Sequence, residues 1–206
     1  AVTDAFASLS VGAINDITSK AFGTSSIMIG DTTTGTIDAA DNNVGVGVDV
    51  FAALTTGDNN VAVGKTALTA NTTGGDNVAV GIQALDANTT GAENIGIGSN
   101  ALGANTTADN NTAIGGGALA SNTTGYQNTS MGRSALAANT TANNNTAIGY
   151  YALTANTTGI DNTAVGASAL GANTTGTVNT AVGKNALLLT TTGTYNSAFG
   201  KGTLDA

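Results

Sequence analysis

The chain has 206 residues, of which 41% are hydrophobic, 4% aromatic and 9% charged, and its formal net charge is −8. So few aromatic residues exclude a conventional core of large interlocking side chains, and five basic residues without a cluster argue against nucleic acid as a partner. The absence of His and Cys removes imidazole and thiolate chemistry, disulfides and the commonest general base.

A 17-residue repeat governs most of the sequence. Asn recurs ten times at this spacing, from Asn43 to Asn196, and Gly follows four residues later each time, from Gly47 to Gly200. Such a period in Pro-free sequence indicates a solenoid, whose coils bury their apolar sides by stacking. We therefore predict an all-β fold, a parallel β-solenoid (β-roll) of about 12 coils that each rise ~4.8 Å. The two parts are degenerate N-terminal coils over 1–42, forming an assembly end, and regular repeats over 43–206.

Residues 1–42 fit the pattern loosely. One step of 17 residues back from Asn43 reaches residues 26–30 (Ser-Ile-Met-Ile-Gly), which have the pattern of a strand. A second step reaches residues 8–12, one residue out of phase. Terminal repeats are expected to be atypical, so this segment is interpreted as about two degenerate coils.

Each regular coil begins with a short predicted strand, as in residues 162–166 (Asn-Thr-Ala-Val-Gly). Alternation at period two with β-branched residues predicts that Thr163 and Val165 point into the coil. The residue between them is Ala, Gly or Ser in every copy and is predicted to face outward. Its small size suggests a close neighbour, either another subunit or another part of the stack, so Ala147→Arg is expected to disrupt assembly. The predicted outward Ala column is Ala62, Ala79, Ala113, Ala147, Ala164, Ala181 and Ala198.

A second strand is predicted where Ala-Leu-x-Ala follows two variable positions. The Leu of this pattern is the largest regular core residue and is expected to form one buried stack. The stack consists of Leu68, Leu85, Leu102, Leu119, Leu136, Leu153, Leu170 and Leu187.

The coil closes with Asn-Thr-Thr-Gly. Gly is expected to supply a positive φ at this corner, although Ala108 and Ala142 replace it in two copies. Stacked Asn side chains are predicted to form a hydrogen-bonded ladder along the solenoid. The ladder residues are Asn71, Asn88, Asn105, Asn122, Asn139, Asn156 and Asn173.

Short motifs in the repeat carry little chemistry. Residues 64–66 (Gly-Lys-Thr) resemble the end of a phosphate loop, but Asn59 stands where that motif requires Gly. Residues 96–101 imitate a dinucleotide fingerprint without a helix pattern behind it. The seven Asn-Thr-Thr triplets satisfy the N-glycosylation pattern, yet a stacked turn requires the same triplet.

A row of carboxylates in one loop column suggests Ca²⁺ ligation, but the uncharged residues that interrupt the row favour a solvated acidic edge. The row consists of Asp58, Asp76, Glu93, Asp109 and Asp161. We expect no metal and no cofactor. No stretch of about 18 apolar residues is present, so no membrane insertion is expected either.

The repeat resembles those of trimeric autotransporter adhesin heads and of bacteriophage tail-fibre-like and bacterial surface proteins, over about residues 26–206. The resemblance implies a left-handed β-roll, often trimeric, in an extracellular or virion fibre that holds a binding tip away from a surface. Surface glycans are partners of the kind such a fibre meets. The repeats of adhesin heads are usually shorter than those of this chain.

Three functions remain open at this point. A structural subunit of an extracellular fibre or filament fits a chain in which every coil presents the same residues, and no enzyme is expected. The alternatives are a segment of a phage tail fibre or trimeric adhesin, and an ice-binding solenoid with regularly spaced Thr columns. Adjacent Thr residues of one corner point to opposite faces if extended, so the corner would offer one rank.

The filament hypothesis predicts a head-to-tail polymer. The chain stops in the phase of Leu68, just before a closing turn, and an open solenoid end exposes unpaired backbone groups. A following subunit could continue the coil, and a heterologous contact of this kind generates an open polymer. The expected assembly ends are Leu9, Val11, Leu204 and Ala206.

Overall fold

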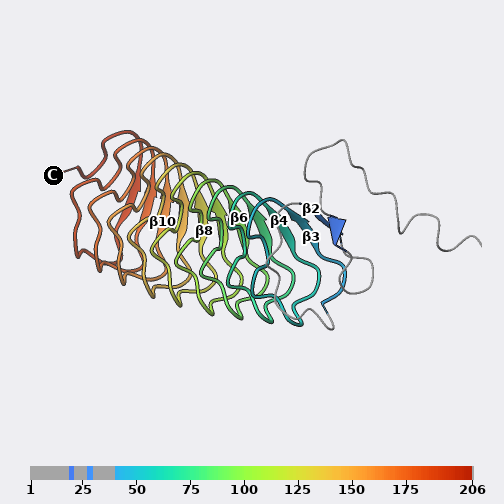
Figure 1. The fold of residues 1–206 in the computed structure, drawn as a ribbon. Helices are drawn as coiled ribbons and strands as arrows, with labels where there is room; N and C mark the ends of the chain where they lie inside the picture. The colour runs from blue at the N-terminus through green and yellow to red at the C-terminus, as the bar shows by residue number, and fades with distance from the viewer. Residues whose placement is uncertain (1–18, 21–26, 30–39, 206) are drawn as a thin grey trace, which may run out of the picture.

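The computed structural model describes residues 19–20, 27–29 and 40–205, and its strands form one sheet in chain order (Figure 1). From β3 to β12 every strand pairs in parallel with the next, residue i beside residue i+17. The protein is therefore an all-β parallel β-solenoid of about nine turns, with no helix in the described residues. The strands are β1 (Ser19–Lys20), β2 (Ile27–Ile29), β3 (Val44–Val46), β4 (Val61–Val63), β5 (Val78–Val80), β6 (Ile95–Ile97), β7 (Thr112–Ile114), β8 (Thr129–Met131), β9 (Thr146–Ile148), β10 (Thr163–Val165), β11 (Thr180–Val182) and β12 (Ser197–Phe199).

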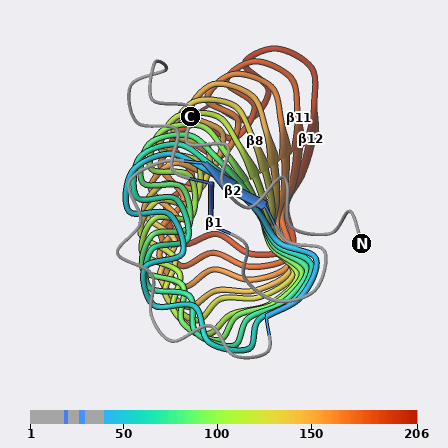
Figure 2. The same ribbon diagram turned by 45° about the vertical axis from the view of Figure 1, so that its right-hand side comes forward.

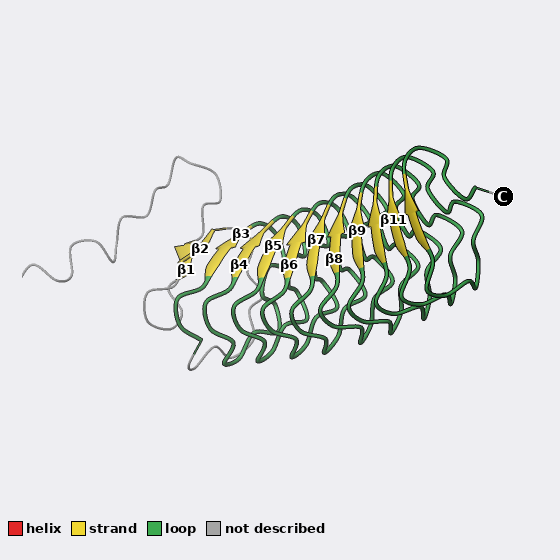
Figure 3. Ribbon diagram, turned by 180° about the vertical axis from the view of Figure 1, so that it is seen from behind, coloured by secondary structure: helices red, strands yellow, loops and turns green. Residues whose placement is uncertain are grey.

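The coils overlie one another when the solenoid is viewed obliquely to its axis (Figure 2), and the strands line one side of it (Figure 3). The 17-residue phase extends back to β2, where Ile27 pairs with Val44 in parallel, as the step back from Asn43 predicts. On the other side of β2 lies β1, in which Ser19 pairs with Ile29 in the antiparallel sense. Residues 8–12 lie outside the described residues.

The strands are turned the opposite way from the prediction. Their middle residue points into the coil: Ala147 is fully buried, whereas Ile148 is 38% exposed. The interior is too narrow for a larger side chain, because a Cβ added at Gly45 would lie 3.1 Å from Phe51 Cδ2, and one at Gly96 would lie 3.3 Å from Leu85 Cγ. The small column thus packs on other parts of the coil stack, and Ala147→Arg is expected to prevent folding, whether or not it also affects assembly.

The Leu stack fills the interior opposite the strands. All eight members are buried, but the segment that carries them is not a strand, and that prediction is wrong. Leu119 has φ of 50°, and turn bonds precede and follow it: Ala118 N–H donates to Gly115 O, and Asn122 N–H donates to Leu119 O. A left-handed backbone costs a non-Gly residue about 1–2 kcal/mol, and full burial of a Leu side chain, worth about 1.5–3 kcal/mol, offsets that cost.

The Gly after each strand is required by two independent constraints. Gly115 has φ of 135°, and a Cβ there would lie 2.6 Å from the carbonyl oxygen of Gly132 in the next coil. The same close approach recurs along the column from Gly47 to Gly183. These constraints explain why no other residue replaces this Gly in any copy.

Gly115→Ala is expected to destabilise the fold by about 2–6 kcal/mol, because the strained backbone and the clash with Gly132 each cost about 1–3 kcal/mol and add. The adjacent Gly116→Ala is a matched control, since its Cβ would meet nothing nearer than 4.0 Å. Thermal unfolding of the two variants checks this. Equal melting temperatures would show that the backbone at Gly115 tolerates a side chain.

The corner Gly has another role than the predicted one. Gly91 does not have a positive φ; a Cβ there would instead lie 2.5 Å from Ala108 O of the next coil. Where Ala occupies the column, the neighbouring backbone bonds lengthen: Thr106 N to Thr123 O is 3.1 Å and Thr140 N to Thr157 O is 3.2 Å, against 2.8 Å from Thr89 N to Thr106 O. The coils therefore accommodate Ala by moving apart slightly.

Candidate interaction surface

The predicted Asn ladder at the corner is present. Each Asn side chain from Asn88 to Asn173 donates through Nδ2 to the Oδ1 of the Asn one coil earlier, at 2.8–3.2 Å. The same Nδ2 donates to the carbonyl three residues later, as from Asn122 to Gly125 O at 2.8 Å. The ladder ends at Asn173, whose buried Oδ1 has no partner because Thr190 takes the next place.

A second ladder, which was not predicted from the sequence, runs through the Asn that precedes each strand. Asn145 N–H donates to Asn128 Oδ1 at 3.0 Å, and Asn128 Nδ2 donates to Ala142 O at 2.9 Å. The backbone-to-Oδ1 bond recurs in every coil from Asn60 to Asn196. The ten Asn residues at 17-residue spacing could have predicted this ladder, because a buried Asn side chain requires hydrogen-bond partners and the next Asn in the stack supplies them.

The Asn-Thr-Thr triplets do not present glycosylation sites in the folded chain. All seven Asn side chains are fully buried, from Asn71 to Asn173. The first Thr of each corner is bonded to the next coil: Thr89 Oγ1 donates to Thr106 O. The second Thr, such as Thr90, is exposed, so each corner offers a single outward Thr.

The carboxylate row is exposed and partly bonded to backbone. Asp58 Oδ1 accepts from Asp41 N–H at 2.7 Å, and Asp109 Oδ1 accepts from Ala92 N–H at 2.8 Å, each one coil away. Within the described part of the chain, no group of three carboxylates could hold a metal ion. No helix among those residues is long and apolar enough to cross a bilayer.

Asp86 lies half-buried on the side that carries the Leu stack. Burial raises the pKa of its carboxyl above the ordinary 3.8, and hydrogen bonds from the Asp86 and Ala87 N–H groups lower the pKa in part. A raised folded pKa means that the folded chain binds more protons than the unfolded chain. Stability therefore rises as pH falls through the folded pKa.

Asp86→Asn is expected to raise the melting temperature at pH 7, because the amide removes the cost of burying a charge. The gain should vanish below about pH 3, where the carboxyl is protonated in both states. Asp76→Asn, at an exposed position, serves as the control and should change little at either pH. An equal gain from Asp86→Asn at pH 3 and pH 7 would contradict this account.

The outward residues of β3–β12 form one continuous surface, which we call the strand face. It consists of two ranks separated by the buried middle residue, and Val44, Ile97 and Met131 are 37–39% exposed on it. The first rank is Val44, Val61, Val78, Ile95, Thr112, Thr129, Thr146, Thr163, Thr180 and Ser197; the second is Val46, Val63, Val80, Ile97, Ile114, Met131, Ile148, Val165, Val182 and Phe199. Both ranks are apolar from β3 to β6, and the first is Thr from β7 to β11. An exposed surface with this many apolar side chains is a candidate interaction site.

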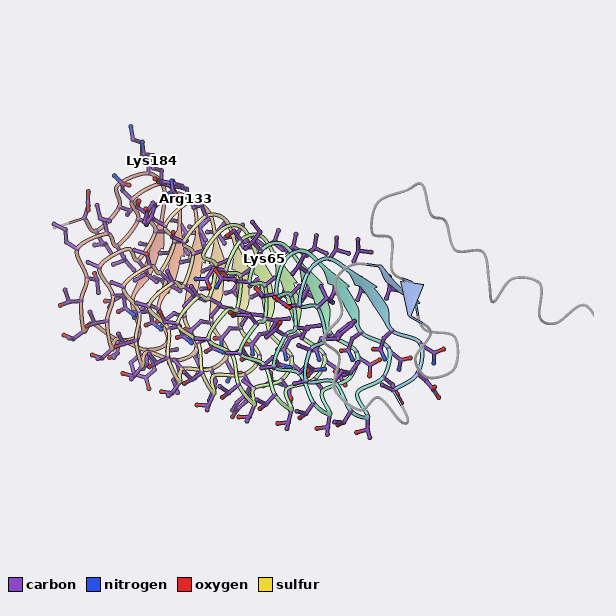
Figure 4. All side chains as sticks on the ribbon, in the orientation of Figure 1. Lys65, Arg133 and Lys184 are labelled. Atoms are coloured by element: carbon purple, nitrogen blue, oxygen red, sulfur yellow. The ribbon has the colours of Figure 1, made fainter. Side chains whose placement is uncertain are left out.

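Charges of opposite sign flank the strand face. The acidic edge, in the two positions before the Asn that precedes each strand, consists of Asp41, Asp58, Asp76, Glu93, Asp109 and Asp161. The basic edge, in the position after the Gly that follows each strand, consists of Lys65, Arg133, Lys184 and Lys201. Figure 4 shows Lys65, Arg133 and Lys184 along the same margin of the solenoid. Asp49 is the one carboxylate adjacent to the basic edge among the residues described.

Of the predicted assembly ends, Leu204 is described and is exposed, with φ of 55°. Leu9, Val11 and Ala206 lie outside the described residues.

Comparison of the chain with protein-family models, with curated proteins and with solved structures finds no match.

Proposed function

We propose that the chain is a structural rod, the shaft of an extracellular or cell-surface fibre, with no catalytic role. The observation that supports this proposal most is the equivalence of the coils. Successive coils place the same types of residue at the same positions, and two Asn ladders join each coil to the next along the axis. Such a body supplies length and stiffness, and neither requires a unique site. A virion fibre or an adhesin would use the same rod.

The proposed rod extends beyond the turns described above. We propose about 12 coils at ~4.8 Å each, hence a length on the order of 57 Å. The antiparallel pairing of β1 with β2 departs from the regular phase, so the coils nearest that end would differ from the others. Its proposed hand is left, in line with the resemblance to adhesin heads.

Deletion of one complete coil tests the proposal. Removal of residues 128–144 joins Gln127 to Asn145 in the same repeat phase, so both ladders and the Leu stack continue across the junction. The shortened chain should fold, and the distance between spin labels attached through Val48→Cys and Thr194→Cys should fall by about 4.8 Å. Electron microscopy should show fibres of unchanged width.

Deletion of residues 128–136 is the matched control. It breaks the 17-residue phase, so the coils can no longer stack, and the chain should lose its fold. Loss of fibres on removal of a complete coil that leaves the rod folded would contradict the proposal, because it would show that one coil carries a unique site.

Ice binding is a second candidate, and the Thr rank of the strand face favours it. Thr112, Thr146 and Thr180 face outward on the sheet, each separated by one residue from an Ile or Val of the second rank. Regular spacing of hydroxyl and methyl groups is what a crystalline water surface would match. Thermal hysteresis of the purified chain, removed by Thr146→Lys, would support this function. Absence of hysteresis in the intact chain would reject it.

A further inference from the structure

We infer that the strand face binds the strand face of a second copy of this chain, with the two rods running in the same direction. This inference rests on the proposed function, since it names the partner of the rod in a fibre. It is carried by three features of the described residues: the apolar ranks, the opposite charge of the two edges, and the coil at which each charge stands.

The two edges cannot neutralise one another within one chain. The Asn, the three strand residues and the Gly that lie between the two edges span roughly 15 Å at ~3.3 Å per residue, which is beyond the reach of a salt bridge. In a second copy, however, an edge of opposite sign can lie directly opposite. Which edges meet depends on the direction of the second rod.

In a parallel pair, the twofold axis runs along the solenoid between the two faces. Rotation about this axis places the acidic edge of one copy over the basic edge of the other, with each coil level with its counterpart. Lys65 of one copy then lies level with Asp58 of the second copy, because both residues belong to the coil of β4. Arg133 lies one coil from Asp109, and Lys184 lies one coil from Asp161, a step of about 4.8 Å that a long side chain spans.

An antiparallel pair brings like charges together. With β3–β12 fully overlapped, the coil of β4 faces the coil of β11, so Lys65 meets Lys184. The coil of β5 faces the coil of β10, so Asp76 meets Asp161. Like charges opposed across an interface disfavour the arrangement that creates them.

The distribution of apolar residues favours the same direction. A parallel pair places the coils of β3–β6, where both ranks are Val or Ile, against the same coils of the second copy. An antiparallel pair places them against the half in which the first rank is Thr or Ser, from β9 to β12. Burial of apolar surface against apolar surface is the larger gain.

The area is sufficient for a stable pair. Ten strands at ~4.8 Å spacing give a length of about 48 Å, and a distance of about 15 Å between the edges gives about 720 Å² on each partner. Specific, stable interfaces bury about 600–1,000 Å² per partner. One second copy therefore covers the strand face from edge to edge.

A distance measurement between two copies tests the inference directly. The chain has no Cys, so Thr194→Cys introduces a single attachment point for a spin label at an exposed position beside β12. A parallel pair places the two labels at one level, about 20–30 Å apart. An antiparallel pair places them at opposite ends, more than about 40 Å apart. We expect a twofold assembly with the short distance; an antiparallel pair, a trimer or a monomer at high concentration would each overturn the inference.

Charge reversal provides an independent test. The double variant Arg133→Glu and Lys184→Glu opposes acidic residues to the acidic edge and should weaken pairing at least tenfold, measured by sedimentation, with a smaller effect at high salt. A control with the same net charge change carries four Thr→Glu substitutions at the exposed corner, namely Thr73, Thr90, Thr124 and Thr158. Equal weakening by the control would overturn the role of the edges. Failure of pairing in a rod that still shortens by one coil on deletion of 128–144 would reject this inference and leave the proposed function standing.

Discussion

Leu119→Asp should abolish folding. The Leu119 side chain is fully buried in the Leu stack, between Leu102 and Leu136 of the adjacent coils. The substitution removes a packed side chain, which costs about 2–5 kcal/mol, and it adds the cost of a buried charge without a partner. The sum reaches the total stability of about 5–15 kcal/mol that a protein of this size has.

Far-ultraviolet circular dichroism and resistance to proteolysis check this prediction. Thr124→Asp is the matched control, since it adds the same charge at an exposed corner five residues away. Leu119→Ala should fall between the two, because it leaves a cavity but no charge. A folded Leu119→Asp chain with an unchanged melting temperature would show that this side chain does not lie in the core.

Asn128→Leu should have the next largest effect, although it makes the interior more apolar. Asn128 Oδ1 accepts from Asn145 N–H at 3.0 Å, and its Nδ2 donates to Ala142 O at 2.9 Å and to Asn111 Oδ1 at 3.2 Å. Leu leaves the buried Asn145 N–H without its acceptor, at about 1–3 kcal/mol. It also removes one hydrogen bond each from Ala142 O and Asn111 Oδ1, at about 0.5–1.5 kcal/mol each, although Asn139 Nδ2 and the N–H of residue 128 still donate to them. We expect a loss of about 2–6 kcal/mol in the free energy of unfolding.

Asn128→Asp separates the two functions of this side chain. The carboxylate still accepts from Asn145 N–H, but it cannot donate to Ala142 O and it buries a charge. Its folded pKa would be raised, so stability should recover as pH falls through that pKa. Chemical denaturation at pH 7 and pH 4 measures the difference, with Thr124→Ala as a control. A loss below 1 kcal/mol for Asn128→Leu would show that the ladder contributes little.

Much of the fold follows from periodicity alone. The 17-residue phase, the strand at each Asn-x-x-x-Gly pattern, the buried Leu and the corner ladder all follow from residues that recur in register. A repeat protein places identical residues at identical positions, so one correct reading applies to every coil. The phase even identifies β2, where the sequence around Ile27 has diverged.

The direction of the strand side chains could not be read from hydrophobicity. Val and Ile are more apolar than Ala, so the alternation suggested Val inside, but an exposed apolar residue is common in proteins. The size of the interior decides the matter: the Leu stack and two Asn ladders leave space for Ala147 or Ser130, not for Val. The restriction of one column to Ala, Gly and Ser was the signal for a close neighbour, but we expected the column to face outward, toward another subunit or another part of the stack.

The charged edges were not predicted either, because their members are widely separated in the sequence. The four cations of the basic edge are far apart in the sequence, up to 68 residues between Lys65 and Arg133. Their common column emerges once the chain is divided into coils and the strand face is known to point outward. The Leu segment was misassigned for a different reason, since no residue type in Ala-Leu-x-Ala signals the positive φ of Leu119.

Reactivity of single Cys residues on one strand tests the central claim, that small residues face inward and β-branched residues face outward. Because the chain has no Cys, Ala147→Cys and Ile148→Cys each carry one thiol, on opposite sides of β9. At dilute concentration, the thiol of Ile148→Cys should react with a water-soluble reagent at nearly the rate of an unfolded peptide, and that of Ala147→Cys should react only after denaturation. Protection at position 148 together with free reaction at position 147 would contradict the account.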